Sequence, residues 1–281
     1  MSVSGAGTVL FTCAIAVMVI ACRAGGPDRA DVLLATTTSF QDSGLLDVLR
    51  EDFQERTGYR LRPTAVGTGA ALAIGANGDA DVLFVHAPSV EREFMAAGNG
   101  ERRTLVMHND FVIVGPTADP ARVMGARTFD ALRRIVGERA LFISRGDRSG
   151  THLLELELWK QTGITPNGDW YVEASTGMGN TLAIASEKRA YTLTDRGTYL
   201  ARRSAVDLAI VVEKDPPLLN PYHVITVSPT KFPRVNEAGA RAFAEYLLSP
   251  EAQALIGSFG TKEYGEPLFF PDAGKSEEDL R

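Results

Sequence analysis

The sequence predicts an α/β protein with mainly parallel sheets and two lobes, on the strength of three observations. Short apolar runs alternate with amphipathic segments along most of the chain, a pattern typical of strands followed by helices. Several of these runs are apolar throughout, as strands buried on both faces are. The chain has 281 residues, which is enough for two lobes with separate cores.

Eight runs of four to six residues fit buried strands. They are Val32–Ala35, Leu61–Val66, Asp81–Val85, Phe111–Gly115, Leu141–Ser144, Tyr191–Thr194, Leu208–Val212 and His223–Val227. Amphipathic segments between and after these runs fit helices. The first has Asp42 or Ser43 as its N-cap, one face marked by Leu45, Leu46, Leu49 and Phe53, and Gly58 as its stop. The others are about Ser89–Ala97, Phe129–Val136, Gly150–Lys160, Thr181–Lys188, Asn236–Leu248 and Pro250–Phe259.

Composition excludes several classes of protein. Hydrophobic residues make up 44% of the chain, which is too many for a disordered protein. The net charge of −6 argues against a nucleic-acid-binding surface. The acidic segment 271–281 is expected to be solvated and disordered.

The amino-terminal segment predicts export. Residues 1–21 carry no charged side chain, and their apolar run is too short to span a bilayer but suits a signal peptide. The run ends in Val19-Ile20-Ala21-Cys22, which resembles a lipobox and implies lipidation of Cys22; plain secretion is the alternative. Residues 22–30 would then form a tether. The rest of the chain has no cysteine, so neither a disulfide nor a thiol nucleophile is expected.

Polar residues and glycines recur where predicted strands lead into helices. The four segments are 36–39, 67–70, 145–151 and 175–180. A helix N-terminus offers unpaired backbone N–H groups that favour an anion, and Ser or Thr hydroxyls add short donors. Four such ends converging on a cleft would bind a small tetrahedral oxyanion, with Arg145 supplying a charge and a planar fork of donors.

Five longer segments together resemble the tungstate-binding proteins of bacterial ABC importers. They are TTTSFQDSGLLDVL at 36–49, ADVLFVHAP at 80–88, NDFVIVGP at 109–116, SRGDRSGTHLLELELW at 144–159 and AYTLTDRGTYL at 190–200. The resemblance extends from about residue 31 to residue 270. His108 departs from the pattern, since that family usually has a tyrosine directly before the Asn-Asp pair.

The resemblance implies a type II periplasmic-binding-protein fold, in which two α/β lobes are joined by two crossover strands. Lobe 1 would comprise 31–110 with 215–270, and lobe 2 would comprise 111–214. The segment NDFVIVGP would be the first crossover, and the run around Val211–Asp215 would be the return.

The resemblance also implies a set of oxyanion-binding residues. Thr37 and Thr38 match the first loop, while Thr68 and the amides of Gly69 and Ala70 match the second. Arg145 with Ser149, Gly150 and Thr151 matches an R-x-x-x-S-G-T element that also resembles the anion loop of phosphate-binding proteins. The amides from Gly177 through Met178 to Gly179 would add a contact from the same lobe.

The expected function is capture of tungstate or molybdate and delivery to an ABC permease, outside the cytoplasm. Two alternatives stay open: a phosphate-binding protein, with Asp147 as acceptor for the phosphate proton, and an oxyanion sensor for a membrane signalling partner. No catalytic residue, metal site or cofactor is expected, because His86, His108, His152 and His223 fall in no hydrolase or zinc motif. His152 follows Thr151 and is the histidine placed to feel a bound dianion. We expect a monomer, held at the membrane through Cys22.

Overall fold

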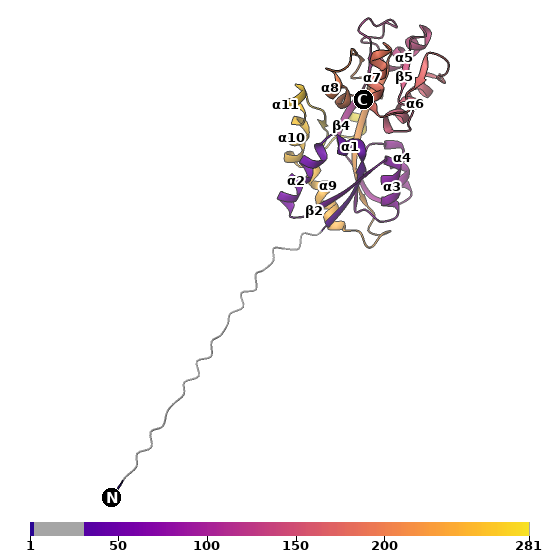
Figure 1. The fold of residues 1–281 in the computed structure, drawn as a ribbon. Coiled ribbons are helices and arrows are strands. Elements are labelled where there is room, and N and C mark those ends of the chain that lie inside the picture. The colour runs from indigo at the N-terminus through magenta and orange to yellow at the C-terminus, as the bar shows by residue number, and fades with distance from the viewer. Residues whose placement is uncertain (3–30, 281) are drawn as a thin grey trace.

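The structure, a computed structural model, describes residues 1–2 and 31–280. Cys22, the predicted tether and all but the first two residues of the predicted signal peptide lie outside the described residues. The described chain forms two α/β bodies, one above the other in Figure 1, and we call the lower body lobe 1 and the upper body lobe 2. None of its described helices combines the length and the apolar character needed to cross a membrane.

The lower body in Figure 1 is built on one mixed sheet with the strand order β10-β4-β9-β3-β1-β2. These strands are β10 (Phe270–Pro271), β4 (Gly100–Gly115), β9 (Leu219–Val227), β3 (Val82–Val85), β1 (Asp31–Thr37) and β2 (Arg60–Val66). β2, β1 and β3 are parallel, and β9 inserts antiparallel between β3 and β4. β3 is apolar and buried throughout, and β1 is buried from Leu34 to Thr37, because helices cover both faces of the sheet there.

The helices of lobe 1 are α1 (Thr38–Asp42), α2 (Leu45–Thr57), α3 (Thr68–Ala76), α4 (Pro88–Ala96), α9 (Glu237–Leu247), α10 (Pro250–Ser258) and α11 (Thr261–Tyr264). They pack in two groups. One core cluster joins the sheet to α2, α9 and α10 through residues such as Phe53, Phe243 and Ile256, and a second joins it to α3 and α4 through Leu72 and Phe94.

The upper body contains the end of β4, which pairs antiparallel with β7 (Thr192–Asp195) and β8 (Ala209–Val212). β5 (Phe142–Ser144) and β6 (Tyr171–Glu173) form a parallel pair that is bridged to Tyr191. The helices here are α5 (Thr128–Gly137), α6 (Gly150–Thr162), α7 (Met178–Glu187) and α8 (Arg196–Arg202). An aromatic core holds this lobe together, with the Trp159 ring 5.3 Å from Phe142 and 5.6 Å from Trp170.

β4 is the first connection between the lobes. Asp110 pairs with Leu219 in the lower sheet, and the next residue, Phe111, pairs with Asp195 in the upper lobe. The chain returns between β8 and β9, through the short 3₁₀ turn Pro216–Leu218. These pairings support the predicted lobe boundaries, 31–110 with 215–270 and 111–214, which stay a proposal.

Arg196, at the start of α8, clamps both connections. Its guanidinium bonds the two oxygens of Asp110 in β4 at 2.8 and 2.6 Å, and a carboxylate oxygen of Glu213 on the return segment at 2.8 Å. Arg196 and Asp110 are both buried. The hydrogen bonds that Arg196 donates to Asp110 raise the pKa of Arg196 further above its usual range.

The structure departs from the predicted elements in three ways. The sheets are mixed rather than mainly parallel, since β9 and the partners of β4 run antiparallel. The predicted strand 111–115 is the end of a 16-residue strand whose charged beginning hid it. α8, α11, β6 and β10 were not predicted, because they are short and β6 exposes two of its three residues, whereas α1 and α3 are the helices expected after 36–39 and 67–70.

The prediction that residues 271–281 are disordered is wrong for residues 271–280. Pro271 pairs with β4, and the buried carboxylate of Asp272 lies 2.6 Å from His108 Nδ1. Glu277, in a short 3₁₀ helix (Glu277–Leu280), lies 2.6 Å from Arg103 and 3.3 Å from the buried His223. Composition alone gives no sign of these basic partners, which come from distant strands.

His108 contacts the carboxy-terminal segment in two ways. Its ring stacks on Phe270 at 5.1 Å with an interplanar angle of 21°, and its Nδ1 holds Asp272. This residue is thus part of the anchor for the carboxy-terminal segment.

Asp272→Ala is expected to lower the free energy of unfolding by about 2 kcal/mol, because it removes buried hydrogen bonds to His108 and Lys275. Urea unfolding followed by circular dichroism measures the change. Glu278→Ala, an exposed carboxylate of the same segment, is the control and should change the free energy by less than about 0.5 kcal/mol. Equal stability of the two variants would contradict the anchoring role.

Candidate functional site

Three parallel strands of lobe 1 end side by side and bring three polar loops to one edge of the sheet. The last residue of β1, Thr37, is in register with Val66, the last residue of β2. Thr36 is in register with Phe84 of β3, two residues before His86. Since neighbouring strands lie about 4.8 Å apart, the loops that follow them start within contact distance of each other.

Thr37 is the N-cap of α1, and its hydroxyl oxygen accepts from the backbone N–H of Phe40 at 3.3 Å. The same hydroxyl lies 3.2 Å from Ser39 Oγ and 3.2 Å from His86 Nε2. Ser39 Oγ is also 3.2 Å from His86 Nε2. Two hydroxyls therefore share one imidazole nitrogen, while the side chain of Thr38 is exposed.

His86 is fixed on its other side by lobe 1 residues. Its Nδ1 lies 3.0 Å from Asn220 Oδ1, and its ring stacks on Tyr222 with centroids 4.4 Å apart. Asn220 Nδ2 in turn donates to Asn109 Oδ1 at 2.7 Å. Burial lowers the pKa of His86, against the opposing effects of the Asn220 bond and the carboxylates of Glu91 and Asp195. The ring is therefore neutral at about pH 7.

The second predicted loop begins α3. Gly67 is its N-cap, in an extended conformation with no side-chain cap, so the first backbone N–H groups of the helix have no side-chain partner. Thr68 is half-buried, and Gly69 and Ala70 are exposed. A Cβ at Gly67 or Gly69 would meet open space, so the loop leaves room in front of these amides.

In lobe 2, two loops also start side by side, at the ends of neighbouring strands. Ser144, the last residue of β5, is in register with Glu173, the last residue of β6. The loops that follow carry Arg145 and Gly177, respectively. A Cβ at Gly146 would lie 2.8 Å from Glu173 Cβ, and Gly146 has a φ of +66°, so this close approach needs glycine.

The Arg145 loop is held by an ion pair and by a hydrogen bond from its backbone to the side chain of Asp147. Arg145 Nε lies 2.8 Å from Asp147 Oδ2, although off the line of a good hydrogen bond, and Asp147 Oδ1 accepts from the backbone N–H of Ser149 at 3.0 Å. Asp147 thus pairs with Arg145 and not with the neighbouring Arg148. Although burial alone would raise it, the pKa of Asp147 is lowered by Ser149 and by Arg145.

Hydrogen bonds of Ser149 and His152 join this loop to α6. Ser149 is the N-cap of α6 and accepts from the backbone N–H of His152, while His152 Nδ1 accepts from the backbone N–H of Arg148 at 3.0 Å. Thr151 and His152 are both buried. His152 thus has a positioning role in the loop.

The fourth predicted segment begins α7. Gly177 is its N-cap, with open space where a Cβ would stand, so its neighbouring amides are accessible. Met178 is buried in the core and offers the site only its backbone. A Cβ at Gly179 would lie 3.3 Å from Arg202 Nε, which places a second guanidinium beside the first turn of α7.

The two lobes meet at His86 and Gly150. A Cβ built on Gly150, the first residue of α6, would lie 3.8 Å from His86 Cε1. The start of α6 in lobe 2 thus faces the imidazole that Thr37 and Ser39 hold in lobe 1. Strand register places the predicted loops beside each other in pairs within each lobe, and this approach brings the start of α6 close to the first pair.

His86 lies among the loops that the sequence analysis singled out, although the sequence analysis set it aside. The rule that found the other loops, a polar residue directly after a buried parallel strand, applies equally to Val82–Val85 and the His86 that follows. The histidine was instead set aside because it belongs to no catalytic motif. Asn220 and Tyr222 come from a strand far along the chain, and no local signal marks them.

Glu155 is a second missed residue and supports the Arg145 loop from beneath. It lies one turn after Thr151 in α6, is 2% exposed, and accepts from Tyr171 Oη at 2.7 Å and Trp159 Nε1 at 3.2 Å. The backbone N–H of Arg145 also donates to it. Burial raises the pKa of Glu155 to about 7, and these hydrogen bonds limit the rise.

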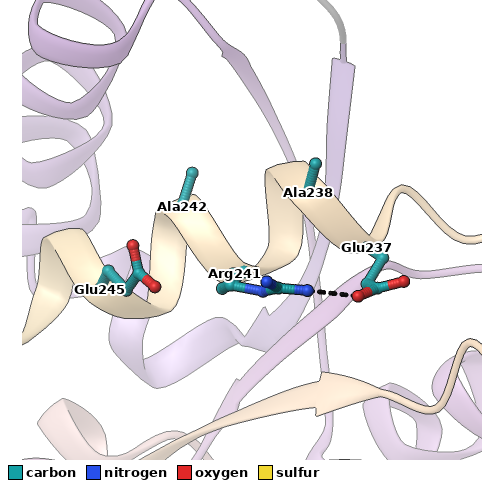
Figure 2. Close-up of a pocket in the computed structure, with 5 residues that line it drawn as sticks. All are labelled: Glu237, Ala238, Arg241, Ala242 and Glu245. Atoms are coloured by element: carbon teal, nitrogen blue, oxygen red, sulfur yellow. Dashed lines mark hydrogen bonds and ion pairs between the residues drawn. The ribbon is translucent and has the colours of Figure 1, made fainter.

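Two surface hollows, of about 410 and 230 Å³, lie away from these loops. The first runs along α9, where Figure 2 shows Arg241 paired with Glu237 and Glu245 one turn further. Two carboxylates around one guanidinium make this hollow a poor anion site. Among the described residues no group of three or more His, Cys, Asp or Glu side chains is arranged to hold a metal ion.

Comparison with known proteins gives a family for this architecture. Residues 23–251 match the PBP superfamily domain. The chain is 51% identical over 250 residues to the tungstate-binding protein TupA of Peptoclostridium acidaminophilum, covering 88% of this chain and 87% of that protein. It is 41% identical over 240 residues to the protein of the same name from Campylobacter jejuni, covering 84% and 88%.

Solved structures agree. The tungstate-binding protein TupA from Desulfovibrio alaskensis G20 superposes with a TM-score of 0.82 at 46% identity, covering 87% of this chain and 99% of that one. The structure described as the tungstate ABC transporter from Geobacter sulfurreducens gives a TM-score of 0.70 at 48% identity, covering 82% and 98%.

Two α/β lobes joined by β4 and its return segment, with polar loops at their facing edges, make the chain a member of the PBP superfamily with the two-lobed periplasmic-binding fold. Within that superfamily it belongs to the family of the TupA proteins.

Stability is expected to depend on pH through Glu155. Its pKa is about 7 in the folded protein and 4.5 in the unfolded chain, so the folded state binds more protons between these values and loses stability as pH rises through them. Glu155→Gln does not titrate. The free energy of unfolding of Glu155→Gln relative to the unmodified protein should therefore rise by about 3 kcal/mol between about pH 4.5 and pH 8.

Urea unfolding at several pH values tests this expectation. Glu157→Gln, an exposed carboxylate on the same helix, is the matched control and should follow the unmodified protein at every pH. A constant difference between Glu155→Gln and the unmodified protein across the range would show that Glu155 is ionised throughout.

Proposed function

We propose that this protein is the solute-binding component of an importer: it captures tungstate or molybdate between its two lobes, outside the cytoplasm, and delivers the anion to an ABC permease. The observation that carries the proposal is the approach of α6 at Gly150 to the Thr37, Ser39 and His86 cluster. It brings backbone donors from one lobe against hydroxyl donors from the other. The relatives named above as tungstate-binding proteins support the choice of ligand.

The chemistry of the loops suits a fully deprotonated tetrahedral anion. The groups that we assign to the anion are hydroxyls, backbone N–H groups at the starts of α3, α6 and α7, and the Arg145 guanidinium. All of them can donate hydrogen bonds, and tungstate and molybdate are acceptors only. Thr37, Thr38, Thr68, Gly69, Ala70, Arg145, Ser149, Gly150, Thr151, Gly177 and Met178 are the residues assigned to this role.

Phosphate is disfavoured because it carries a proton part of the time and then needs an acceptor. Asp147, the carboxylate nearest to Arg145, already accepts from Ser149 through one oxygen and pairs with Arg145 through the other. Its pKa is held low by these partners, and with both oxygens engaged within the loop, neither is left to accept the proton of a phosphate.

The remaining features of the proposal follow from this role. The protein acts as a carrier with no reaction to catalyse and no resident cofactor, and the oxyanion is its cargo. Export would be directed by residues 1–21, with Cys22 as the lipid attachment point. A monomer is sufficient, because both halves of the site come from one chain.

Calorimetric titration of the purified protein with tungstate, molybdate, phosphate and sulfate tests the proposal. All four anions should be titrated at one pH and one salt concentration. Tungstate and molybdate are expected to bind at least about 100-fold more tightly than phosphate. The reason is that the O–H group of a protonated phosphate would find no hydrogen-bond acceptor in the site. A preference for phosphate would contradict the ligand assignment, and binding of none of the four would contradict the function.

Arg145→Ala is expected to weaken tungstate binding by about 2–4 kcal/mol, since a desolvated dianion loses its charged fork of donors. Arg133→Ala, an exposed arginine of the same lobe paired with Asp130, is the control and should leave affinity unchanged. The measurement is the dissociation constant by calorimetry. Tungstate affinity equal in the Arg145 variant and the control would place the site elsewhere.

A further inference from the structure

His86 sits where the two halves of the proposed site meet, and its hydrogen bonds compete with those of the anion. Thr37 and Ser39 are both 3.2 Å from its Nε2. Each hydroxyl has one hydrogen to donate. A hydroxyl hydrogen directed at Nε2 is therefore not available to an oxyanion in the cleft.

The hydrogen-bond network fixes which ring nitrogen carries the proton in the neutral form. Asn220 Nδ2 donates to Asn109, so Asn220 Oδ1 faces His86 Nδ1 as an acceptor. The neutral ring therefore carries its proton on Nδ1, and Nε2 accepts from Thr37 or Ser39. The lobe 1 donors are partly occupied while His86 is neutral.

A second proton on the ring reverses this arrangement. Nε2–H then donates to the hydroxyl oxygens of Thr37 and Ser39, and both hydroxyl hydrogens become free to point at an anion. The imidazolium also places a positive charge beside the cleft, opposite the positive end of α6 at Gly150. A bound dianion would satisfy both of these positive groups.

The surroundings of the ring allow this charge once an anion is present. The carboxylates of Glu91, at the start of α4, and Asp195, at the end of β7, act on the ring in favour of the charged form. Tyr222 of β9, stacked on the ring, is the other titratable neighbour, and burial raises its pKa, so it stays neutral. Burial of His86 is the opposing influence, and it keeps the ring neutral in the free protein.

We propose that His86 is a ligand-site residue that takes up one proton from solvent when tungstate binds, and that this proton releases the Thr37 and Ser39 hydroxyls to the anion. The inference rests on the proposed function. No bond of the anion changes: the proton moves from solvent to Nε2, and the tungstate stays a dianion.

Proton uptake makes affinity depend on pH in a defined direction. Between the pKa of His86 in the free protein and its higher pKa in the complex, tungstate affinity should fall about tenfold for each unit that pH rises. Below this window the ring is already charged, and above it the complex forms without the proton, so affinity levels off at both ends.

Nitrogen NMR of the imidazole rings tests the proposal directly. The chain has four histidines, and the His86 signals can be assigned by their loss in His86→Gln. At about pH 7 the free protein should show His86 neutral with the proton on Nδ1, and the tungstate-saturated protein should show both nitrogens protonated. A ring that stays neutral in the saturated complex would overturn the proposal even where tungstate binds tightly.

Calorimetry in buffers of different protonation enthalpy gives a second readout. The unmodified protein should take up close to one proton per tungstate within the window, whereas His86→Gln should bind more weakly with no uptake. His108→Gln, outside the site, is the control and should keep the uptake. Uptake retained by His86→Gln would assign the proton to another group and overturn the proposal. Absence of any tungstate binding by the unmodified protein would contradict the proposed function itself.

Discussion

The relation between the two lobes depends on the ion pair between Arg196 and Asp110. β4 changes partners at Asp110, from β9 below to β7 above, and this is the point where the first connection could bend. Arg196 holds both oxygens of Asp110 and also reaches Glu213 on the return segment, so a single side chain ties the two connections together. A buried pair of this kind gives little net stability, but losing one partner is costly, which makes it suited to fixing geometry.

The clamp matters because neither lobe contains a complete set of donors. Lobe 1 offers Thr37, Ser39 and the start of α3, and lobe 2 offers the Arg145 loop and the start of α7. In the proposed function, these groups act on one anion when Gly150 faces His86, at the 3.8 Å approach that a Cβ on Gly150 would make. The lobe-to-lobe geometry set at Asp110 would then determine whether the donors are shared, and small neutral donors would let an acidic protein bind an anion.

Much of this arrangement could be predicted from the sequence. The apolar runs located most strands, and hydroxyls and glycines after buried strands identified the loops at 36–39, 67–70, 145–151 and 175–180. These signals are local, since each loop follows its own strand and caps its own helix. The assignment of anion contacts to individual residues in these loops stays a prediction.

What the sequence did not predict depends on partners far along the chain. His86 gains its orientation from Asn220 and Tyr222, more than 130 residues later. The carboxy-terminal segment was expected to be disordered because it is acidic. Its partners are Arg103, His108 and His223, and their strands carry no sequence signal for this contact. Glu155 has partners nearer in sequence, Trp159 and Tyr171, but no local pattern shows that their side chains bond to its carboxylate.

The central claim is that loops from both lobes hold one oxyanion next to the point where His86 and the start of α6 approach each other. The most direct measurement is a crystal structure of the protein grown with tungstate, with the metal located by its anomalous scattering. The account predicts a single strong peak in the cleft, with its oxygens within hydrogen-bond distance of Thr37, Arg145 and the backbone of Gly150. A peak bound by only one lobe, or at the hollow along α9, would contradict it.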